Sequence, residues 1–89
     1  MTLKDVLKEE FIGLHVHVID ARNEANKGIK GIVVDETRSM FTISTQRKEK
    51  KLIKHNVTLR VSIKGKTYDI DGSLLVGRPE DRLKKRVKL

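Results

Sequence analysis

Residues 57–71, with the sequence VTLRVSIKGKTYDID, decide the fold class. Alternate residues of the first half are apolar, so one face of a half-buried strand carries Val57, Leu59, Val61 and Ile63. The dipeptide Lys64-Gly65 predicts a two-residue hairpin turn, because glycine readily adopts the positive φ that such turns require. The segment KTYDID then returns as a second strand and ends at a turn at Asp71-Gly72. This stretch therefore predicts an antiparallel β-hairpin.

Further short strands are predicted on the N-terminal side of this hairpin. The segment LHVHVID (14–20) alternates, which places its leucine and two valines on one face and His15, His17 and Ile19 on the other. The segment IKGIVVDE (29–36) is apolar and rich in β-branched residues. Its internal Gly31 marks a place where a strand bends sharply or approaches another backbone.

A third region continues this strand-rich pattern. The segment MFTIST (40–45) alternates and is expected to bury Phe41 and Ile43. After a polar link at 46–49, the basic segment KKLIKH (50–55) leads back to the hairpin. The connections are short and polar, and no helix is predicted between consecutive strands, which favours an all-β antiparallel architecture.

Short helices are predicted at both ends of the chain. Apolar residues recur at helical spacing near residues 3–10, and Gly13 ends that helix. Near the C-terminus, Pro79 suits the first turn of a helix, two acidic residues follow it, and basic residues come later, as the helix dipole favours. Leu83 and Val87 are four residues apart and would pack this helix on the body of the protein.

The size of the chain limits the architecture. Its 89 residues suffice for one modest core, so we expect a single domain over 1–89. We expect a small closed antiparallel barrel of about six strands with short terminal helices. Closure would remove exposed sheet edges, and the internal glycines would supply the bends of tight curvature.

The positive charge is concentrated in two segments. The chain has 20 Lys and Arg against 12 Asp and Glu, a net charge of +8. Segments 46–55 and 78–89 each carry +4, and the remaining residues balance. Clustered charge favours a polyanionic partner, since solubility requires only dispersed charge. A lysine-rich solvated surface of the kind found in heat-adapted proteins is the alternative interpretation.

Several classes of protein are disfavoured by composition. There is no Cys, so the chain has no disulfide, no thiolate nucleophile and no Cys-based zinc site. No apolar run approaches the roughly 20 residues of a spanning helix, and the N-terminus is too charged for a secretory signal. We therefore expect a soluble cytoplasmic protein with no membrane partner. One Tyr and two Phe are too few for a surface that stacks single-stranded bases, which leaves backbone recognition of folded RNA or duplex.

The polar clusters are incomplete as catalytic or metal sites. His15 and His17 share a strand face, but a zinc site ordinarily needs three or four protein ligands. Asp69 and Asp71 also share a face and lack a third ligand or a nucleophile, so we interpret them as solvent-facing residues. The acidic pair at 35–36 is interpreted as a strand end before a turn held by short polar side chains.

Two motifs resemble a known family. The sequences GIKGIVVDET (28–37) and GRPEDR (77–82) occur in an order and at a separation that resemble the Sm-like barrel proteins of archaeal ribonuclease P, called protein component 1. The resemblance covers roughly residues 10 to 86. It implies an Sm-like or SH3-like barrel.

The resemblance also implies a function. The chain would be an RNA-binding subunit of ribonuclease P, the endoribonuclease that removes the 5′ leader from precursor tRNA. The RNA subunit would carry out the cleavage with Mg²⁺, and this protein would bind no cofactor and would not be catalytic alone. Its expected partners are ribonuclease P RNA, precursor tRNA indirectly, and the small zinc-ribbon protein subunit.

The candidate residues follow from the charge clusters and from the motifs. The expected RNA contacts are Arg47, Lys48, Lys50, Lys51, Lys54, Arg78, Arg82, Lys84, Lys85 and Arg86. The motif residues expected to have structural roles are Gly28, Gly31, Asp35, Glu36, Thr37, Pro79, Glu80 and Asp81.

Three alternatives belong to other functional classes. The glycine-bearing segment is also similar to a loop of small ribosomal and transcription-factor barrels, which would make the chain an RNA-binding module of another complex. The chain could instead be a scaffold that binds only protein, which salt-dependent RNA binding would exclude. It could also be a nuclease in its own right, which would cleave precursor tRNA in the absence of an RNA subunit.

Overall fold

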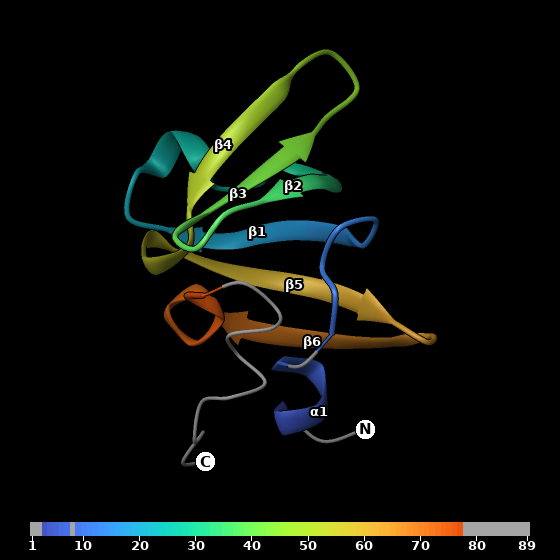
Figure 1. Ribbon diagram of the computed structural model, residues 1–89. Coiled ribbons are helices and arrows are strands. Elements are labelled where there is room, and N and C mark those ends of the chain that lie inside the picture. The colour runs from blue at the N-terminus through green and yellow to red at the C-terminus, as the bar shows by residue number, and fades with distance from the viewer. Residues whose placement is uncertain (1–2, 8, 78–89) are drawn as a thin grey trace.

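The described chain is a single antiparallel sheet with short helical turns around it (Figure 1). A computed structural model describes residues 3–7 and 9–77. The sheet has six strands in the order β4-β3-β2-β1-β5-β6. Its strands are β1 (His15–Ala21), β2 (Lys30–Glu36), β3 (Met40–Ser44), β4 (Glu49–Ile53), β5 (Val57–Ile63) and β6 (Lys66–Asp71).

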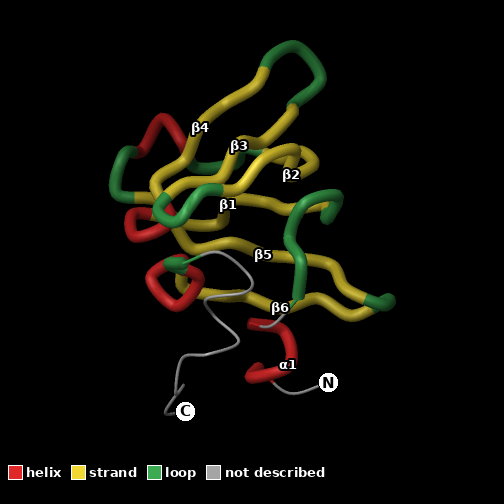
Figure 2. Tube along the Cα trace, in the orientation of Figure 1, coloured by secondary structure: helices red, strands yellow, loops and turns green. Residues whose placement is uncertain are grey.

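Within residues 3–7 and 9–77, four short helical elements accompany the sheet (Figure 2). They are α1 (Leu3–Leu7) and the 3-10 helices η1 (Glu24–Asn26), η2 (Lys54–Asn56) and η3 (Gly72–Leu75). The predicted N-terminal helix is present but shorter than expected. Acidic Glu9 and Glu10 follow it, and negative charge at a helix C-terminus is unfavourable. The helix predicted after Pro79 lies outside the described residues.

The predicted hairpin is confirmed in detail. β5 and β6 pair from Thr58 with Asp71 to Ile63 with Lys66, so the turn is Lys64-Gly65 as expected. Both turn residues have positive φ, 51° and 79°. Such values match the right-handed twist of the flanking strands. All four predicted apolar residues of β5 are buried.

Closure of the barrel is not confirmed. Among the described residues, no strand pairing joins β4 to β6, so these two strands are the edges of the sheet. Figure 1 shows a strongly twisted sheet whose β3–β4 hairpin extends away from β5 and β6. Register shifts in β1 between Val18 and Asp20, and in β2 between Val33 and Asp35, interrupt the ladders. Bulges of this kind bend a strand and increase its twist.

The core lies on one face of the sheet and includes the N-terminal segment. Val6, Leu7 and Phe11 are at most 1% exposed and belong to the same cluster as the buried residues of β1, β3 and β5. The rings of Phe11 and Phe41 stack with centroids 5.6 Å apart. No helix in the described part of the chain is long and apolar enough to cross a membrane.

Gly31 lies where the backbones of β2 and β3 approach each other closely, which was one of the two predicted reasons for a glycine there. A Cβ atom at this position would collide with the carbonyl oxygen of Ser44 on β3 and would lie 2.8 Å from Cγ2 of Ile43. Only glycine allows β2 to approach β3 this closely.

Candidate nucleic-acid interface

The turn between β3 and β4 presents part of the predicted basic segment. Thr45 closes this turn: its backbone N–H donates to the carbonyl of Lys48 at 2.9 Å, and its hydroxyl donates to the same carbonyl at 2.7 Å. A Thr at the first position of a turn is favoured because its side chain bonds the local backbone. Arg47 and Lys48 are exposed at the tip of this hairpin, which projects from the body (Figure 1).

Two further predicted bases lie on β4, an edge strand. Lys51 is exposed and pairs across the ladder with Thr42, whereas Lys50 is half-buried and pairs with Ile43. Lysines on an edge strand discourage pairing with a second sheet. These residues, with Arg47 and Lys48, place four predicted bases on one hairpin.

Lys54 is a core residue rather than a surface RNA contact, contrary to the expectation. Its side chain is 0% exposed, and Nζ lies 2.6 Å from Oε2 of Glu36. Nζ also donates to the carbonyl of Gly77 at 2.8 Å and lies 4.6 Å from the centroid of the Phe41 ring. A buried ammonium is tolerated only when such partners replace water. Strand alternation, which places residue 54 on the same side as buried Leu52, was the signal that could have revealed it.

The remaining predicted residues lie outside the described part of the chain. They are the bases Arg78, Arg82, Lys84, Lys85 and Arg86 and the motif residues Pro79, Glu80 and Asp81.

The other motif residues lie in β2, at its bulge and in the turns that adjoin it. Gly28 has a φ of 86°. Its N–H donates to the carbonyl of Val18 at 2.8 Å. Glu36 ends β2, and Thr37 closes the next turn by donating its N–H to the carbonyl of Met40 at 2.9 Å. Asp35 is exposed on β2 at the bulge.

The two carboxylates of β6 accept hydrogen bonds from groups on β5 and η3. Asp69 accepts hydrogen bonds from Nε and Nη2 of Arg60 at 2.8 and 3.1 Å, which hold the pKa of Asp69 below its ordinary value. Asp71 caps η3 by accepting from the backbone N–H of Ser73 at 2.9 Å. This bond is the main reason that the pKa of Asp71 is lowered.

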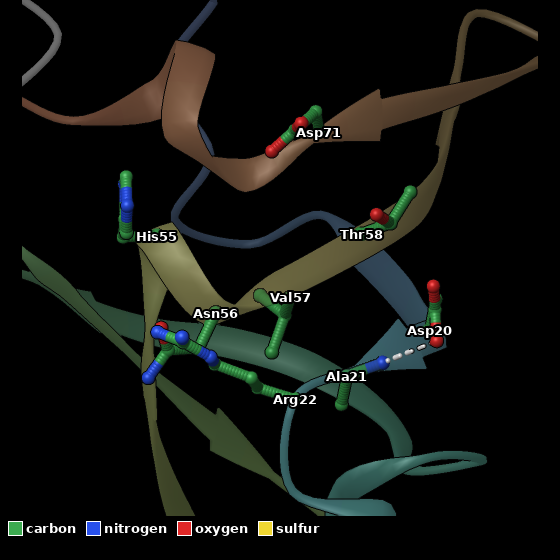
Figure 3. A pocket seen from close by; sticks show the side chains of 8 residues that line it. All are labelled: Asp20, Ala21, Arg22, His55, Asn56, Val57, Thr58 and Asp71. Atoms are coloured by element: carbon green, nitrogen blue, oxygen red, sulfur yellow. Dashed lines mark hydrogen bonds between the residues drawn. The ribbon is translucent and has the colours of Figure 1, made fainter.

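A polar pocket lies where β1 and β6 end and β5 begins (Figure 3). It has a volume of about 430 Å³, and Asp20 and Asp71 flank Thr58 across three paired strands. Asp20 accepts from the N–H of Ala21 at 2.9 Å, and Figure 3 shows Arg22 and His55 on the side away from Asp20. The described residues contain no group of three or more His, Cys, Asp or Glu side chains that could hold a metal ion. The pocket has no complete set of metal ligands among them.

Sequence reasoning missed bases that only strand pairing brings together. Lys30 faces His17 on β1, and His17 faces Arg60 on β5. These residues are isolated in the sequence, and no local pattern connects them. Cross-strand register was the missing signal, because it requires knowing the bulges and the strand order.

The comparisons with known proteins cover nearly the whole chain. The family model described as "Ribonuclease P/MRP, subunit p29" matches residues 4–85. Ribonuclease P protein component 1 of Methanocaldococcus jannaschii is 41% identical over 90 residues, with 100% of this chain and 95% of that protein covered. The protein of the same name from Thermofilum pendens is 43% identical over 91 residues, covering 100% and 97%.

A solved structure supports the same assignment. It is described as Mth11, a homologue of the human ribonuclease P protein Rpp29, and is 36% identical. The TM-score is 0.61, with 83% of this chain and 97% of that chain covered. Together with the matched family model, this similarity in sequence and fold shows that the chain belongs to the ribonuclease P/MRP subunit p29 family.

Proposed function

We propose that this chain is an RNA-binding protein subunit of an archaeal ribonuclease P, which removes the 5′ leader from precursor tRNA. The observation that carries the proposal is the family match over residues 4–85, together with relatives of about 40% identity named ribonuclease P protein component 1. Coverage of nearly the entire chain favours this function over a role in a ribosomal or transcription complex.

The β3–β4 hairpin, which we call the basic hairpin, supplies a physical means of binding RNA through Arg47, Lys48, Lys50 and Lys51. Lysine and arginine side chains that neutralise phosphates release condensed counterions, which favours association. Contacts of this kind fix position and orientation on the nucleic acid without reading its sequence. Arg47 and Lys48 are exposed on a projecting turn, which suits them to contact phosphates.

Catalysis is assigned to the RNA subunit, with Mg²⁺ acting on that RNA. Asp69 and Asp71 are already engaged by Arg60 and Ser73, which supports a structural role for both. We therefore expect Asp69→Asn and Asp71→Asn to leave the rate of the reconstituted cleavage step within a few-fold. A loss of about a thousandfold at saturating Mg²⁺, with folding and assembly intact, would place the chemistry on this protein.

The proposed partners are ribonuclease P RNA, precursor tRNA indirectly, and a small zinc-ribbon subunit of the same enzyme, in the cytoplasm. Reconstitution tests the function directly. Precursor tRNA cleavage by the RNA subunit is measured at limiting Mg²⁺, with and without this chain and its protein partner. We expect the chain to raise the rate, and Arg47→Gln/Lys48→Gln to raise it less. Equal rates with and without the chain would contradict the proposal.

A further inference from the structure

Three strands contribute a row of bases to the face of the sheet away from the core. Lys30 on β2 pairs with His17 on β1, and His17 pairs with Arg60 on β5. All three side chains point away from the core, because their neighbours Val16, Val18 and the apolar residues of β5 are buried. Adjacent strands are about 4.8 Å apart, so the row spans roughly 10 Å across β2, β1 and β5.

A groove runs beside this row. It has a volume of about 280 Å³ and is lined by His15, Val16, His17, Lys30, Gly31, Arg60, Ser62 and Thr67. The side chains of these residues supply ammonium, guanidinium, imidazole and hydroxyl groups. Among the residues that the structure describes, no carboxylate lines the groove. Groups of this kind donate hydrogen bonds to phosphate oxygens.

This groove adjoins a second groove beside the β3–β4 turn, because Lys30 lines both of them. The second groove, of about 520 Å³, is lined by Lys30 together with Gly28, Ile29, Thr45, Gln46, Arg47 and Lys48. Lys30 therefore lies between the bases of the β3–β4 turn and those of β1 and β5. The pairing of Ile32 with Ser44 brings the start of β2 alongside this turn.

The ion pair between Arg60 and Asp69 lies at the end of the row nearest to β6. Its two hydrogen bonds, at 2.8 and 3.1 Å, hold the guanidinium, and both side chains remain 48% exposed. Asp69 on β6 pairs with Arg60 on β5, so it lies on the side of Arg60 away from His17. This bidentate pair orients the guanidinium and leaves about half of the Arg60 side chain exposed to solvent.

We propose that Lys30, His17 and Arg60, which we call the cross-strand basic row, bind backbone phosphates of RNA and extend the surface formed by Arg47 and Lys48. The inference rests on the proposed function and identifies the face of the sheet that meets RNA. The groove has no Phe, Tyr or Trp side chain, whereas the centre of a protein interface is enriched in these residues. The same lack of Phe, Tyr and Trp favours the backbone of folded RNA over stacked single-stranded bases.

The test compares two double variants of the full chain that each lose two positive charges. Lys30→Gln/Arg60→Gln removes charge from the row, and Lys64→Gln/Lys66→Gln removes it from the β5–β6 turn, which lines neither groove. Affinity for ribonuclease P RNA is measured by filter binding over a range of salt concentrations. Thermal unfolding of both variants verifies that each is folded.

We expect the row variant to lower the magnitude of the log–log salt slope by up to about 1.8 and to weaken binding roughly tenfold or more at 0.1 M salt. The turn variant should stay close to the parent. Equal losses in both variants, or parent-like binding by the row variant, would overturn the inference. So would unchanged RNA affinity with loss of rate stimulation, which would assign the row to a protein partner. If the parent chain itself neither binds this RNA nor stimulates cleavage, the proposed function fails first.

Discussion

At the scale of single residues, Lys54 illustrates how a base can belong to the core. We expect Lys54→Met to lower the free energy of unfolding by about 3–5 kcal/mol, because the buried carboxylate of Glu36 loses its lysine. The double variant Lys54→Met/Glu36→Leu should recover much of this loss, since an apolar pair of similar volume can replace a buried ion pair. Urea unfolding of both variants measures the effect. A loss below about 1 kcal/mol in the single variant would contradict it.

Asp71 predicts a dependence of stability on pH. Its ordinary pKa of 3.8 is lowered in the folded state, chiefly by the N–H of Ser73. A lowered folded pKa stabilises the protein above the unfolded value, and this contribution is lost as pH falls below about 4. We expect Asp71→Ala to reduce the free energy of unfolding by about 0.5–2 kcal/mol at pH 7, as for loss of a helix cap, and by less at acidic pH. Urea unfolding at neutral and acidic pH would show this, and an equal loss at both would refute it.

At the scale of elements, the contact between β2 and β3 depends on one missing side chain. We expect Gly31→Ala to lower the free energy of unfolding by about 1–3 kcal/mol, because the Cβ atom would push β2 away from the carbonyl of Ser44. Gly31→Asn should lower the free energy of unfolding by at least as much as Gly31→Ala, since the obstacle to any Cβ atom is the neighbouring backbone. Thermal and urea unfolding measure both changes.

Gly28 is the matched control, because its constraint is different. It has a φ of 86°, and a Cβ atom there would meet nothing within 4 Å. Gly28→Ala should cost about 1–2 kcal/mol for the backbone conformation alone. Gly28→Asn should cost less, because Asn is enriched at positive φ. If Asn rescued position 31 as well as position 28, the steric explanation for Gly31 would be wrong.

At the scale of the whole molecule, the excess of positive charge predicts that RNA binding depends steeply on salt. The net charge is +8, and one of the two basic segments, 46–55, forms the β3–β4 turn, β4 and the start of η2. About five phosphate contacts imply a log–log slope of roughly 4 to 5 in magnitude. Filter binding between about 50 and 200 mM salt would measure this slope. A nearly flat dependence would exclude an electrostatic mechanism.

The sequence by itself determined the local features of this protein. Alternation and the Lys64-Gly65 turn specified the β5–β6 hairpin, because side-chain periodicity and glycine φ are properties of a few consecutive residues. Thr37 was likewise recognisable at the start of a turn. The family motifs also identified the class of protein, although part of the second motif lies outside the described residues.

Only the tertiary structure decided which bases are buried and which are neighbours. Lys54 lies in the core because its ammonium group contacts Glu36, Phe41 and Gly77, which are distant in sequence. Lys30, His17 and Arg60 became one row because strand order and register align them. The bulges in β1 and β2, and the absence of pairing between β4 and β6 in the described chain, arise from how the strands twist and pack together. Such non-local contacts leave no periodic signal in any single segment, so their effect on charge placement emerges only when the sheet is assembled.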